Sequence, residues 1–275
     1  MKPEDYPTQE AFGDLAKANH EVVMARAAGI QGEDFQYGED PYQSVGLHRA
    51  ADPNGDVFMF IHGGGWTAGY KEWTSFMAPV VNALGITYVT VGYRLAPMHL
   101  YPSGVEDCAA AVAWAYRHIS AHGGNPERIF IGGHSAGGHY ASWLAVRRDW
   151  QARVGLDEDV IRGCLPVSGV YDFTGGGGMK VRPRFLGKKG SGAETSASSI
   201  HNIQGTPPPF FMSWGSEDFP HLITQAETMQ TALEAAGGDI TSMELLGCDH
   251  LGASYACGDE GGAWITKARE WIQSR

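Results

Sequence analysis

Residues 129–138 read Ile-Phe-Ile-Gly-Gly-His-Ser-Ala-Gly-Gly, a short apolar run followed by a serine among glycines. The apolar run predicts a strand, and a helix-forming stretch at 139–146 follows almost directly. A Gly-x-Ser-x-Gly turn between strand and helix strains the backbone and lifts the serine hydroxyl above the sheet. Ser135 is therefore predicted to be a nucleophile that attacks a carbonyl group.

A serine hydroxyl is a weak nucleophile until a histidine accepts its proton and a carboxylate orients that histidine. In sheets of this kind the partners follow the serine on loops after later strands, the acid before the histidine. Asp218, in the loop after the apolar run 209–214, is the predicted acid, with Glu217 and Asp172 as alternatives. His250, in the loop before the last predicted helix, is the predicted general base.

Residues 62–66, His-Gly-Gly-Gly-Trp, follow another apolar run and offer backbone N–H donors. An attacked carbonyl becomes an oxyanion, which preorganised N–H groups stabilise. Glycines let the backbone turn its amides toward a substrate without a side chain in the way. We predict that the N–H groups of Gly63, Gly64 and Ala136 form an oxyanion hole. A flexible turn is the alternative for such a run, and its position upstream of the serine turn argues against that alternative.

Aromatic and apolar side chains near these motifs are candidates for a substrate pocket. Trp66 is the first choice because it adjoins the glycines, and core packing is the alternative for it and for the aromatic residues that follow it. Further candidates flank the serine turn, the sheet edge and the histidine loop: His139, Tyr140, Phe173, Leu251 and Tyr255.

Alternating strands and helices are predicted to hold these residues. Their regular alternation predicts a mostly parallel sheet with helices on both faces, in a single α/β domain over residues 1–275. The predicted strands are 56–61, 86–93, 128–131, 161–168, 209–214 and 240–246, with short extended pieces at 34–37 and 44–49, and the predicted helices are 75–84, 105–122, 139–146, 225–236 and 262–273.

Two segments lie outside this alternation. Residues 8–28, within an N-terminal helical segment 1–30, predict a helix with apolar residues on one face. Residues 173–203 contain four consecutive glycines and several basic residues, but the phosphate-loop pattern Gly-x-x-x-x-Gly-Lys-Ser/Thr is not met. This stretch is predicted to be a loop that borders the active site. The apolar face of the N-terminal helix comprises Phe12, Leu15, Ala18, Val22 and Val23.

Composition narrows the class of protein further. The formal net charge of −11 argues against nucleic acid and anionic membranes as partners, since both require a basic surface. Four cysteines without a Cys-x-x-Cys pair are predicted to be reduced core thiols and not zinc ligands. The first residues lack the apolar run of a signal peptide, and no window is apolar enough to span a bilayer, so we expect a cytoplasmic protein.

Together these motifs resemble the α/β-hydrolase superfamily over roughly residues 35–275. Residues 93–97, Tyr-Arg-Leu-Ala-Pro, with Tyr101-Pro102 and the helix start at 105–107, are similar to HGGG-type esterases related to hormone-sensitive lipase. The serine turn differs from that group, which usually has aspartate where this chain has His134.

The serine turn is more similar to kynurenine formamidase (arylformamidase) and to related feruloyl and acetyl esterases. The resemblance rests on residues 133–139, on Gly-Ser-Glu-Asp-Phe at 215–219, on Gln225 and on Asp249-His250. Formamidases often have tyrosine at the position of Gly65, which is a departure from their pattern.

The resemblance implies a serine hydrolase that cleaves a carboxylic ester or an aryl formamide through an acyl-serine, with no metal or organic cofactor. His250 would accept the proton of Ser135 and later protonate the leaving group, while Asp218 holds the productive tautomer of His250. A short-acyl or aromatic carboxylesterase is the alternative, and a non-catalytic ligand-binding homologue is a further one. The expected partner is a small-molecule ester or amide, and the chain is expected to be a monomer or a homodimer.

Overall fold

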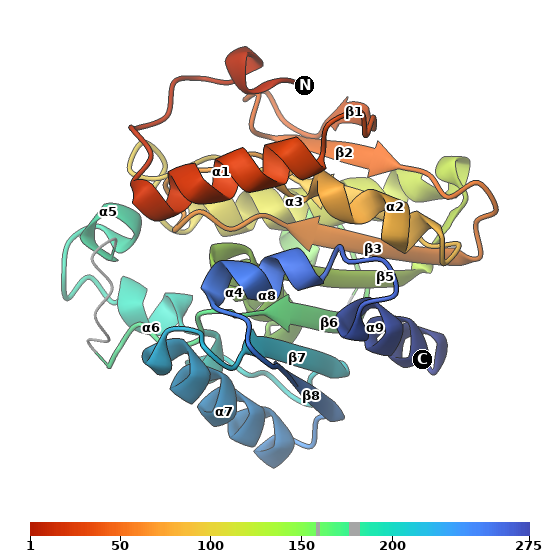
Figure 1. Cartoon of the computed structure of the whole chain (residues 1–275). Helices are drawn as coiled ribbons and strands as arrows, with labels where there is room; N and C mark the ends of the chain where they lie inside the picture. The colour runs from red at the N-terminus through yellow and green to blue at the C-terminus, as the bar shows by residue number, and fades with distance from the viewer. Residues whose placement is uncertain (158–159, 176–181) are drawn as a thin grey trace.

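A computed structural model describes residues 1–157, 160–175 and 182–275. Within these residues an eight-stranded sheet runs through the molecule in the order β1-β2-β4-β3-β5-β6-β7-β8 (Figure 1). The edge strand β1 is antiparallel to β2, β2 is antiparallel to β4, and the other neighbours are parallel. The strands are β1 Glu33–Gln36, β2 Ser44–His48, β3 Gly55–Ile61, β4 Thr87–Val91, β5 Gly124–His134, β6 Ile161–Val167, β7 Phe210–Gly215 and β8 Ile240–Leu245.

Helices cover both faces of this sheet. In Figure 1, α2 and α9 lie in front of the strands, and α3 and α4 lie behind them. The helices are α1 Asp14–Arg26, α2 Ala78–Asn82, α3 Ser103–His118, α4 Ala136–Val146, α5 Arg182–Leu186, α6 Ala193–Ala197, α7 Pro220–Ala235, α8 His250–Ala256 and α9 Ala263–Gln273, with 3-10 turns at Pro3–Asp5, Lys71–Met77, Ile119–His122, Ala152–Val154 and Ser199–His201. The predicted fold class, a single α/β domain with a mostly parallel sheet, is confirmed.

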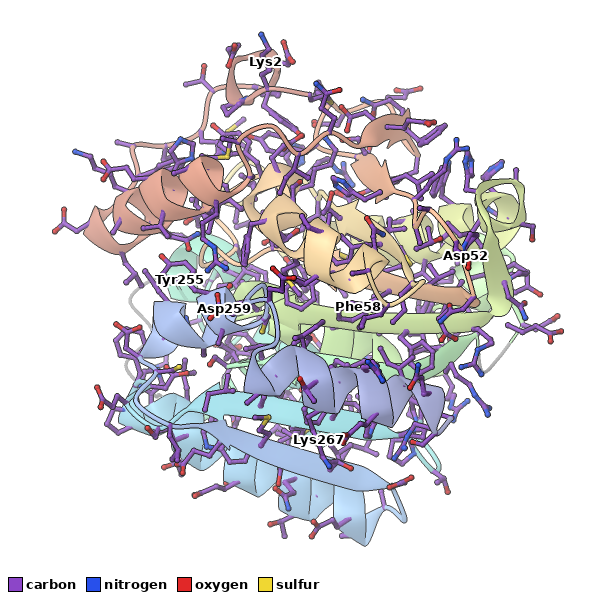
Figure 2. All side chains as sticks on the ribbon, turned by 45° about the vertical axis from the view of Figure 1, so that its right-hand side comes forward. Lys2, Asp52, Phe58, Tyr255, Asp259 and Lys267 are labelled. Carbon is purple, nitrogen blue, oxygen red and sulfur yellow. The ribbon has the colours of Figure 1, made fainter. Side chains whose placement is uncertain are left out.

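Helices cover the central strands on both faces, and the side chains of these strands are accordingly apolar. Residues 56–61 of β3 are buried, and β4 is buried along its whole length. Phe58 lies in the middle of the molecule, whereas Lys2 lies at its periphery (Figure 2). Continuous apolar runs of this kind are typical of parallel strands between two helical layers.

The register of the sheet brings the candidate residues to one end of the sheet, where its parallel strands finish. Ile61 at the end of β3 pairs with Gly133 of β5, and His134 pairs with Val167 at the end of β6. Because these strands are parallel, the loops that follow them leave the sheet at the same end. In Figure 1, α1, α5 and α8 surround that end of the sheet, at the left.

The N-terminal helix differs from its prediction. It begins at Asp14, after Gly13 as N-cap, instead of near residue 8. Of the predicted apolar face, Val23 is buried, whereas Leu15 and Val22 are 49 % and 40 % exposed. The helix packs against the 3-10 turn Lys71–Met77, and Arg26 at its end donates to the carbonyls of Tyr255 and Gly258.

Two other predictions need correction. The helix predicted at 75–84 begins as the 3-10 turn Lys71–Met77 and becomes α-helical only in α2, which has proline in its first turn. The loop predicted at 173–203 contains α5 and α6, and the buried side chains of Phe185 and Leu186 anchor α5. Residues 176–181 of the glycine-rich stretch lie outside the described residues.

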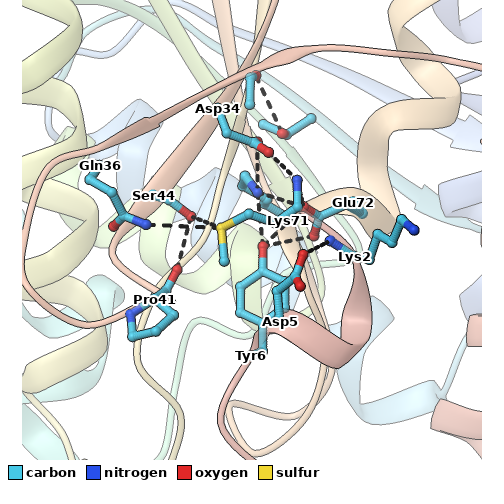
Figure 3. Close-up of polar contacts among 12 residues, drawn as sticks. Lys2, Asp5, Tyr6, Asp34, Gln36, Pro41, Ser44, Lys71 and Glu72 are labelled. Atoms are coloured by element: carbon cyan, nitrogen blue, oxygen red, sulfur yellow. Dashed lines mark hydrogen bonds and ion pairs between the residues drawn. The ribbon is translucent and has the colours of Figure 1, made fainter.

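A buried lysine ties the chain before α1 to the edge of the sheet. Lys71 is 1 % exposed, and its Nζ lies 2.8 Å from the hydroxyl of Tyr6 and 2.9 Å from Asp34, with Glu72 as a third partner (Figure 3). The hydroxyl of Tyr6 donates to the carboxylate of Glu72, with oxygen–oxygen distances of 2.9 and 3.0 Å. Burial and the charge of Glu72 raise the pKa of Tyr6, so this hydroxyl stays protonated and able to donate.

The four cysteines are all unbridged, and Cys248 is the one that is not fully buried. No helix in the described ranges is long and apolar enough to cross a membrane.

Candidate active site

The serine turn lies between β5 and α4 and strains the backbone at its apex. Ser135 has φ 55° and ψ −116°, an unusual conformation for a residue other than glycine. Its N–H donates to the carbonyl of Val167 in β6 over 3.0 Å, which fixes the turn to the sheet. A Cβ at Gly137 would lie 2.0 Å from the carbonyl oxygen of Ile61, so only glycine fits there.

Three predicted side chains meet at this turn. Nε2 of His250 lies 3.0 Å from Oγ of Ser135, and Nδ1 of His250 lies 2.8 Å from Oδ1 of Asp218. His250 is the first residue of α8, whose N-cap Asp249 accepts the N–H of Gly252 over 2.7 Å. This cap fixes the start of the helix and with it the position of the imidazole.

The alternative acids lie elsewhere. Glu217 is exposed, and its N–H is bonded to the carbonyl of Cys248. Asp172 accepts hydrogen bonds from Thr174 and lies 3.3 Å from His201. Neither carboxylate contacts His250, so the structure brings Asp218 and not its competitors to the imidazole.

Asp218 is 4 % exposed, and its surroundings favour the charged carboxylate. Burial by itself raises its pKa, but the hydrogen bond and the charge of His250 lower it, and the N–H of Phe219 also donates to Oδ1 over 2.7 Å. The result is a pKa below the ordinary aspartate value. A buried carboxylate that stays ionised can hold the imidazole with its Nδ1 proton toward the acid.

His134, immediately before the serine, is an additional residue of this site. Its Nε2 lies 2.8 Å from the carbonyl oxygen of His250, to which the ring donates, and the two imidazole centroids are 4.6 Å apart. Burial and the neighbouring His250 lower the pKa of His134 to about 3, so its ring is neutral. Sequence reasoning noted this position only as a departure from a motif and did not predict that it links the serine turn to the histidine loop.

The glycine loop at 62–66 lies directly beside the nucleophile. A Cβ at Gly63 would stand 3.3 Å from Cβ of Ser135, and one at Gly64, whose φ is +118°, would stand 1.9 Å from the carbonyl oxygen of Ala68. In the part of the chain that the structure describes, no backbone carbonyl accepts the N–H of Gly63 or Gly64. The N–H of Ala136, at the first position of α4, has no partner within its helix either.

A cavity of about 760 Å³ opens above Ser135 and His250. Residues 63–68 and Leu251 form part of its lining, and residues 10–16 with Asn19 form one wall. Arg184 of α5 also lines the cavity and makes an ion pair with Glu10 of that wall. The apolar side chains on the cavity are Phe12, Leu15, Trp66, Trp73, Val170, Phe219, Leu222 and Leu251.

Two of the predicted pocket residues, Trp66 and Leu251, line this cavity, and the others do not. His139 is fully buried: its Nδ1 accepts the Nε1 proton of Trp66 over 3.1 Å, and its Nε2 donates to Ala197 over 2.7 Å. Tyr140 and Phe173 are each 2 % exposed and pack with Phe185 in the same aromatic cluster. The prediction that these three bind substrate is corrected: they support Trp66 from within the core. Tyr255 also lies outside the lining.

The wall formed by residues 10–19 was missed by sequence reasoning. The apolar pattern of this segment predicted a helix with an apolar face, and Leu15 of that face borders the cavity with 49 % of its surface exposed. Periodicity identifies an apolar face but does not say whether that face meets the core or a cavity.

The fold of the chain is supported by sequence and structure together. A family model described as alpha/beta hydrolase fold matches residues 58–189, the stretch that contains the glycine loop and the serine turn. The chain has an α/β-hydrolase fold.

Two solved structures of esterases share this fold. The carboxylesterase EstE1 from a metagenomic library superimposes with a TM-score of 0.78 at 21 % identity, over 95 % of this chain and 96 % of that one. An esterase of Pyrobaculum calidifontis gives 0.77 at 20 % identity, over 94 % and 91 %. At these identities the likeness concerns the fold.

Two curated relatives come from Mycobacterium tuberculosis. The probable carboxylic ester hydrolase LipM is 32 % identical over 184 residues, 62 % of this chain and 43 % of LipM. The esterase LipQ is 29 % identical over 202 residues, 68 % of this chain and 47 % of LipQ. The match with this chain thus spans less than half the length of either relative.

Proposed function

We propose that this protein is a carboxylic ester hydrolase that forms an acyl-enzyme on Ser135. The observation that carries the proposal is the continuous chain of contacts from Asp218 through His250 to Ser135, at 2.8 and 3.0 Å, at the base of an apolar cavity. A hydroxyl, an imidazole and a buried carboxylate in this order are the requirements of nucleophilic acyl transfer.

Each residue has a defined role in the proposed reaction. His250 accepts the proton of Ser135 while Oγ attacks the ester carbonyl, and the N–H groups of Gly63, Gly64 and Ala136 stabilise the oxyanion. His250 then protonates the leaving alcohol. A water molecule, deprotonated by the same imidazole, cleaves the acyl-serine and releases the acid. Asp218 keeps the Nδ1 proton of His250 in place throughout.

Esters are preferred here over aryl formamides. The relatives and solved structures described above are esterases, and none of those named is a formamidase. The mostly apolar lining of the cavity supports neutral substrates, and its volume lies within the range of about 300–1,000 Å³ common for small-molecule sites. The proposed substrates are therefore uncharged esters with an apolar or aromatic group.

The proposal is tested by comparing p-nitrophenyl acetate, p-nitrophenyl butyrate, naphthyl acetate and N-formylkynurenine with the parent protein and with Ser135→Ala. We expect hydrolysis of the esters by the parent, with kcat lower by about 10⁴–10⁶ in the variant. Rapid turnover of N-formylkynurenine with slow ester cleavage would reverse the preference for esters. Unimpaired ester hydrolysis by Ser135→Ala would refute the mechanism.

A fluorophosphonate probe distinguishes an enzyme from a binding protein that has kept the fold. It reacts with an activated serine, so the parent should be labelled at Ser135 and the Ser135→Ala variant should not. If the parent stays unlabelled, the non-catalytic alternative replaces the proposed function.

A further inference from the structure

Trp66 and His139 form a hydrogen-bonded pair at the boundary of the cavity. Trp66 lines the cavity with 2 % of its surface exposed, and its Nε1 donates to Nδ1 of His139 over 3.1 Å. His139 is fully buried, and its Nε2 donates to the carbonyl of Ala197, the last residue of α6, over 2.7 Å. One imidazole on α4 thus joins the glycine loop to a segment far away in the chain.

The two partners leave the imidazole of His139 only one arrangement of its proton. An indole N–H can only donate and a backbone carbonyl can only accept, so Nδ1 must carry the lone pair and Nε2 the proton. Burial lowers the pKa of His139 to about 4, so near neutral pH the ring has a single N–H, as the two bonds require. A proton on Nδ1 would break the bond to Trp66.

Other contacts also hold Trp66 in place. Its φ is +63°, a region that favours glycine, and its carbonyl accepts the N–H of Ala96 over 2.9 Å. Its ring stacks on Phe185 of α5, with centroids 4.4 Å apart and planes at 11°, and Phe173 packs beside it. Phe173 and Phe185 are buried and do not line the cavity, so the indole separates them from it. Strained backbone persists where its surroundings enforce it, and it concentrates at functional sites.

We propose that Trp66 limits the length of the ester group that fits against it, and that His139 is the positioning residue that fixes its indole. The inference deepens the proposed ester hydrolase function and rests on it. With the indole fixed, a short group packs against the ring and a longer group collides with it. An indole released from His139 turns more freely, so a short group loses contact and a longer group gains room. The side chain of His139 acts only through Trp66.

Two substitutions at His139 each remove one of its two hydrogen bonds. The amide of asparagine lies near the place of Nδ1, so His139→Asn keeps an acceptor for Trp66 and loses the bond to Ala197. The amide of glutamine reaches about as far as Nε2, so His139→Gln keeps the bond to Ala197 and loses the acceptor for Trp66. Since each variant loses one buried hydrogen bond, we expect similar decreases of Tm in the two.

Only His139→Gln is expected to change the selection of substrates. Its KM for p-nitrophenyl butyrate should rise about three- to tenfold, the value of one hydrogen bond, with kcat within about twofold of the parent. The ratio of kcat/KM for a long ester to that for a short one should also rise. Octanoate and butyrate of p-nitrophenol test the acyl group, and acetates of octanol and ethanol test the alcohol group.

A higher ratio in either series supports the inference and identifies the group that lies against Trp66. His139→Asn should keep the parental KM and both parental ratios. Parental KM and ratios in His139→Gln would overturn the inference, and so would equal changes in the two variants.

Trp66→Phe and Trp143→Phe test the same bond from the other partner, and they remain informative if a His139 variant fails to fold. Trp143, also on α4, donates its Nε1 proton to the carbonyl of Ser196 over 2.8 Å, but it does not line the cavity. Trp66→Phe should raise KM and the length ratio, whereas Trp143→Phe should leave both as in the parent. Equal effects of the two variants would contradict a specific role for Trp66.

The double variant Trp66→Phe with His139→Gln separates the bond from the loss of ring area. Because the same hydrogen bond is lost only once, its KM should be lower than the product of the two separate increases predicts. Independent, multiplicative effects would show that His139 does not act through Trp66.

Nitrogen-15 NMR of the parent tests the hydrogen bond without turnover. Nδ1 of His139 should resonate as an unprotonated nitrogen at neutral pH, with Nε2 protonated. A protonated Nδ1 would overturn the inference, and if that parent still hydrolyses esters the proposed function stands. If the parent hydrolyses no ester, the proposed function fails and the role in substrate selection fails with it, whereas the spectrum still shows whether the pair exists.

Discussion

The floor and the wall of the cavity are built from different kinds of contact. In the floor, formed by residues 63–66, Ser135 and His250, the backbone N–H of Ser135 donates to the carbonyl of Val167 in the sheet over 3.0 Å. The wall, formed by residues 10–16, Asn19 and Arg184, is held by side chains. The proposed reacting groups thus lie at the ends of the strands, and the proposed substrate-contacting wall lies on separate segments of the chain.

The contacts of the wall illustrate this difference. The side-chain amide of Gln9 exchanges two hydrogen bonds with the backbone of Gly69, at 2.8 and 3.0 Å. Nε1 of Trp73 donates to His20 in α1 over 2.9 Å, and Phe12 packs edge-on against the same indole. Substitutions in the floor should therefore change kcat, and substitutions in the wall should change KM or stability.

After Ser135→Ala, the largest effect is expected from Asp218→Asn. An amide can no longer enforce the productive tautomer of His250, so kcat should fall by about 10⁴. Steady-state kinetics on p-nitrophenyl butyrate measure the loss. Glu217→Gln, one residue away and exposed, is the control and should stay close to the parent; a greater defect in that variant would move the acid to Glu217.

A smaller loss is expected from Gly64→Ala in the floor. The added Cβ would lie 1.9 Å from the carbonyl oxygen of Ala68, so the loop must shift and its N–H donors must leave the oxyanion position. Loss of one such donor typically costs about 10²–10³ in kcat.

Gly29→Ala controls for the backbone strain of that variant. Gly29 also has a positive φ, +81°, but a Cβ there would meet nothing within 4 Å. Its substitution should lower Tm without lowering kcat. Equal kcat in the two variants would contradict the assignment of Gly64 to the oxyanion hole.

Changes in the wall should act on binding. Leu15→Ala enlarges the cavity and removes apolar surface, so KM for p-nitrophenyl butyrate should rise about three- to tenfold, the value of roughly one kcal/mol of lost contact. We expect kcat to change less than twofold. Val22→Ala, on the same helix and away from the cavity, should leave both constants unchanged. A large fall in kcat for Leu15→Ala would show that wall and floor are coupled.

The smallest effect on kcat is expected from Lys71→Met, which removes the contacts that tie the chain before α1 to the sheet. Removal of the buried ammonium takes from Asp34 and Glu72 one of the two cations that they share, the other being the N-terminal ammonium of Met1, so we expect a loss of about 1–3 kcal/mol of stability. Urea unfolding should show this loss, with near-parental kcat at low temperature. Lys17→Met, at an exposed position on α1, should change stability by less than about 0.5 kcal/mol. Equal unfolding midpoints in the two variants would contradict a stabilising role for Lys71.

The comparison of floor and wall also explains what the sequence could predict. The serine turn, the glycine loop and the loop positions of Asp218 and His250 follow from short motifs attached to apolar strands, because local spacing and strand order determine them. Strand positions were predicted to within a few residues for the same reason. These features depend on neighbours in the chain.

The remaining features depend on contacts between distant segments. Proximity to Ser135 in sequence suggested that His139 and Tyr140 reach the substrate, but α4 turns both side chains into the core. The cavity wall, the buried partners of Lys71 and the bond from His134 to the carbonyl of His250 involve residues far apart in the chain. Periodicity and spacing carry no information about such pairs.

The ion pair between Glu10 and Arg184 has a consequence for how the molecule assembles. It joins two residues of the cavity lining that are separated by more than half of the polypeptide, and contacts of such long separation cost the most chain entropy to form early. The sheet is expected to form first and this ion pair only in the last stage of folding, an order that rapid-mixing experiments can follow.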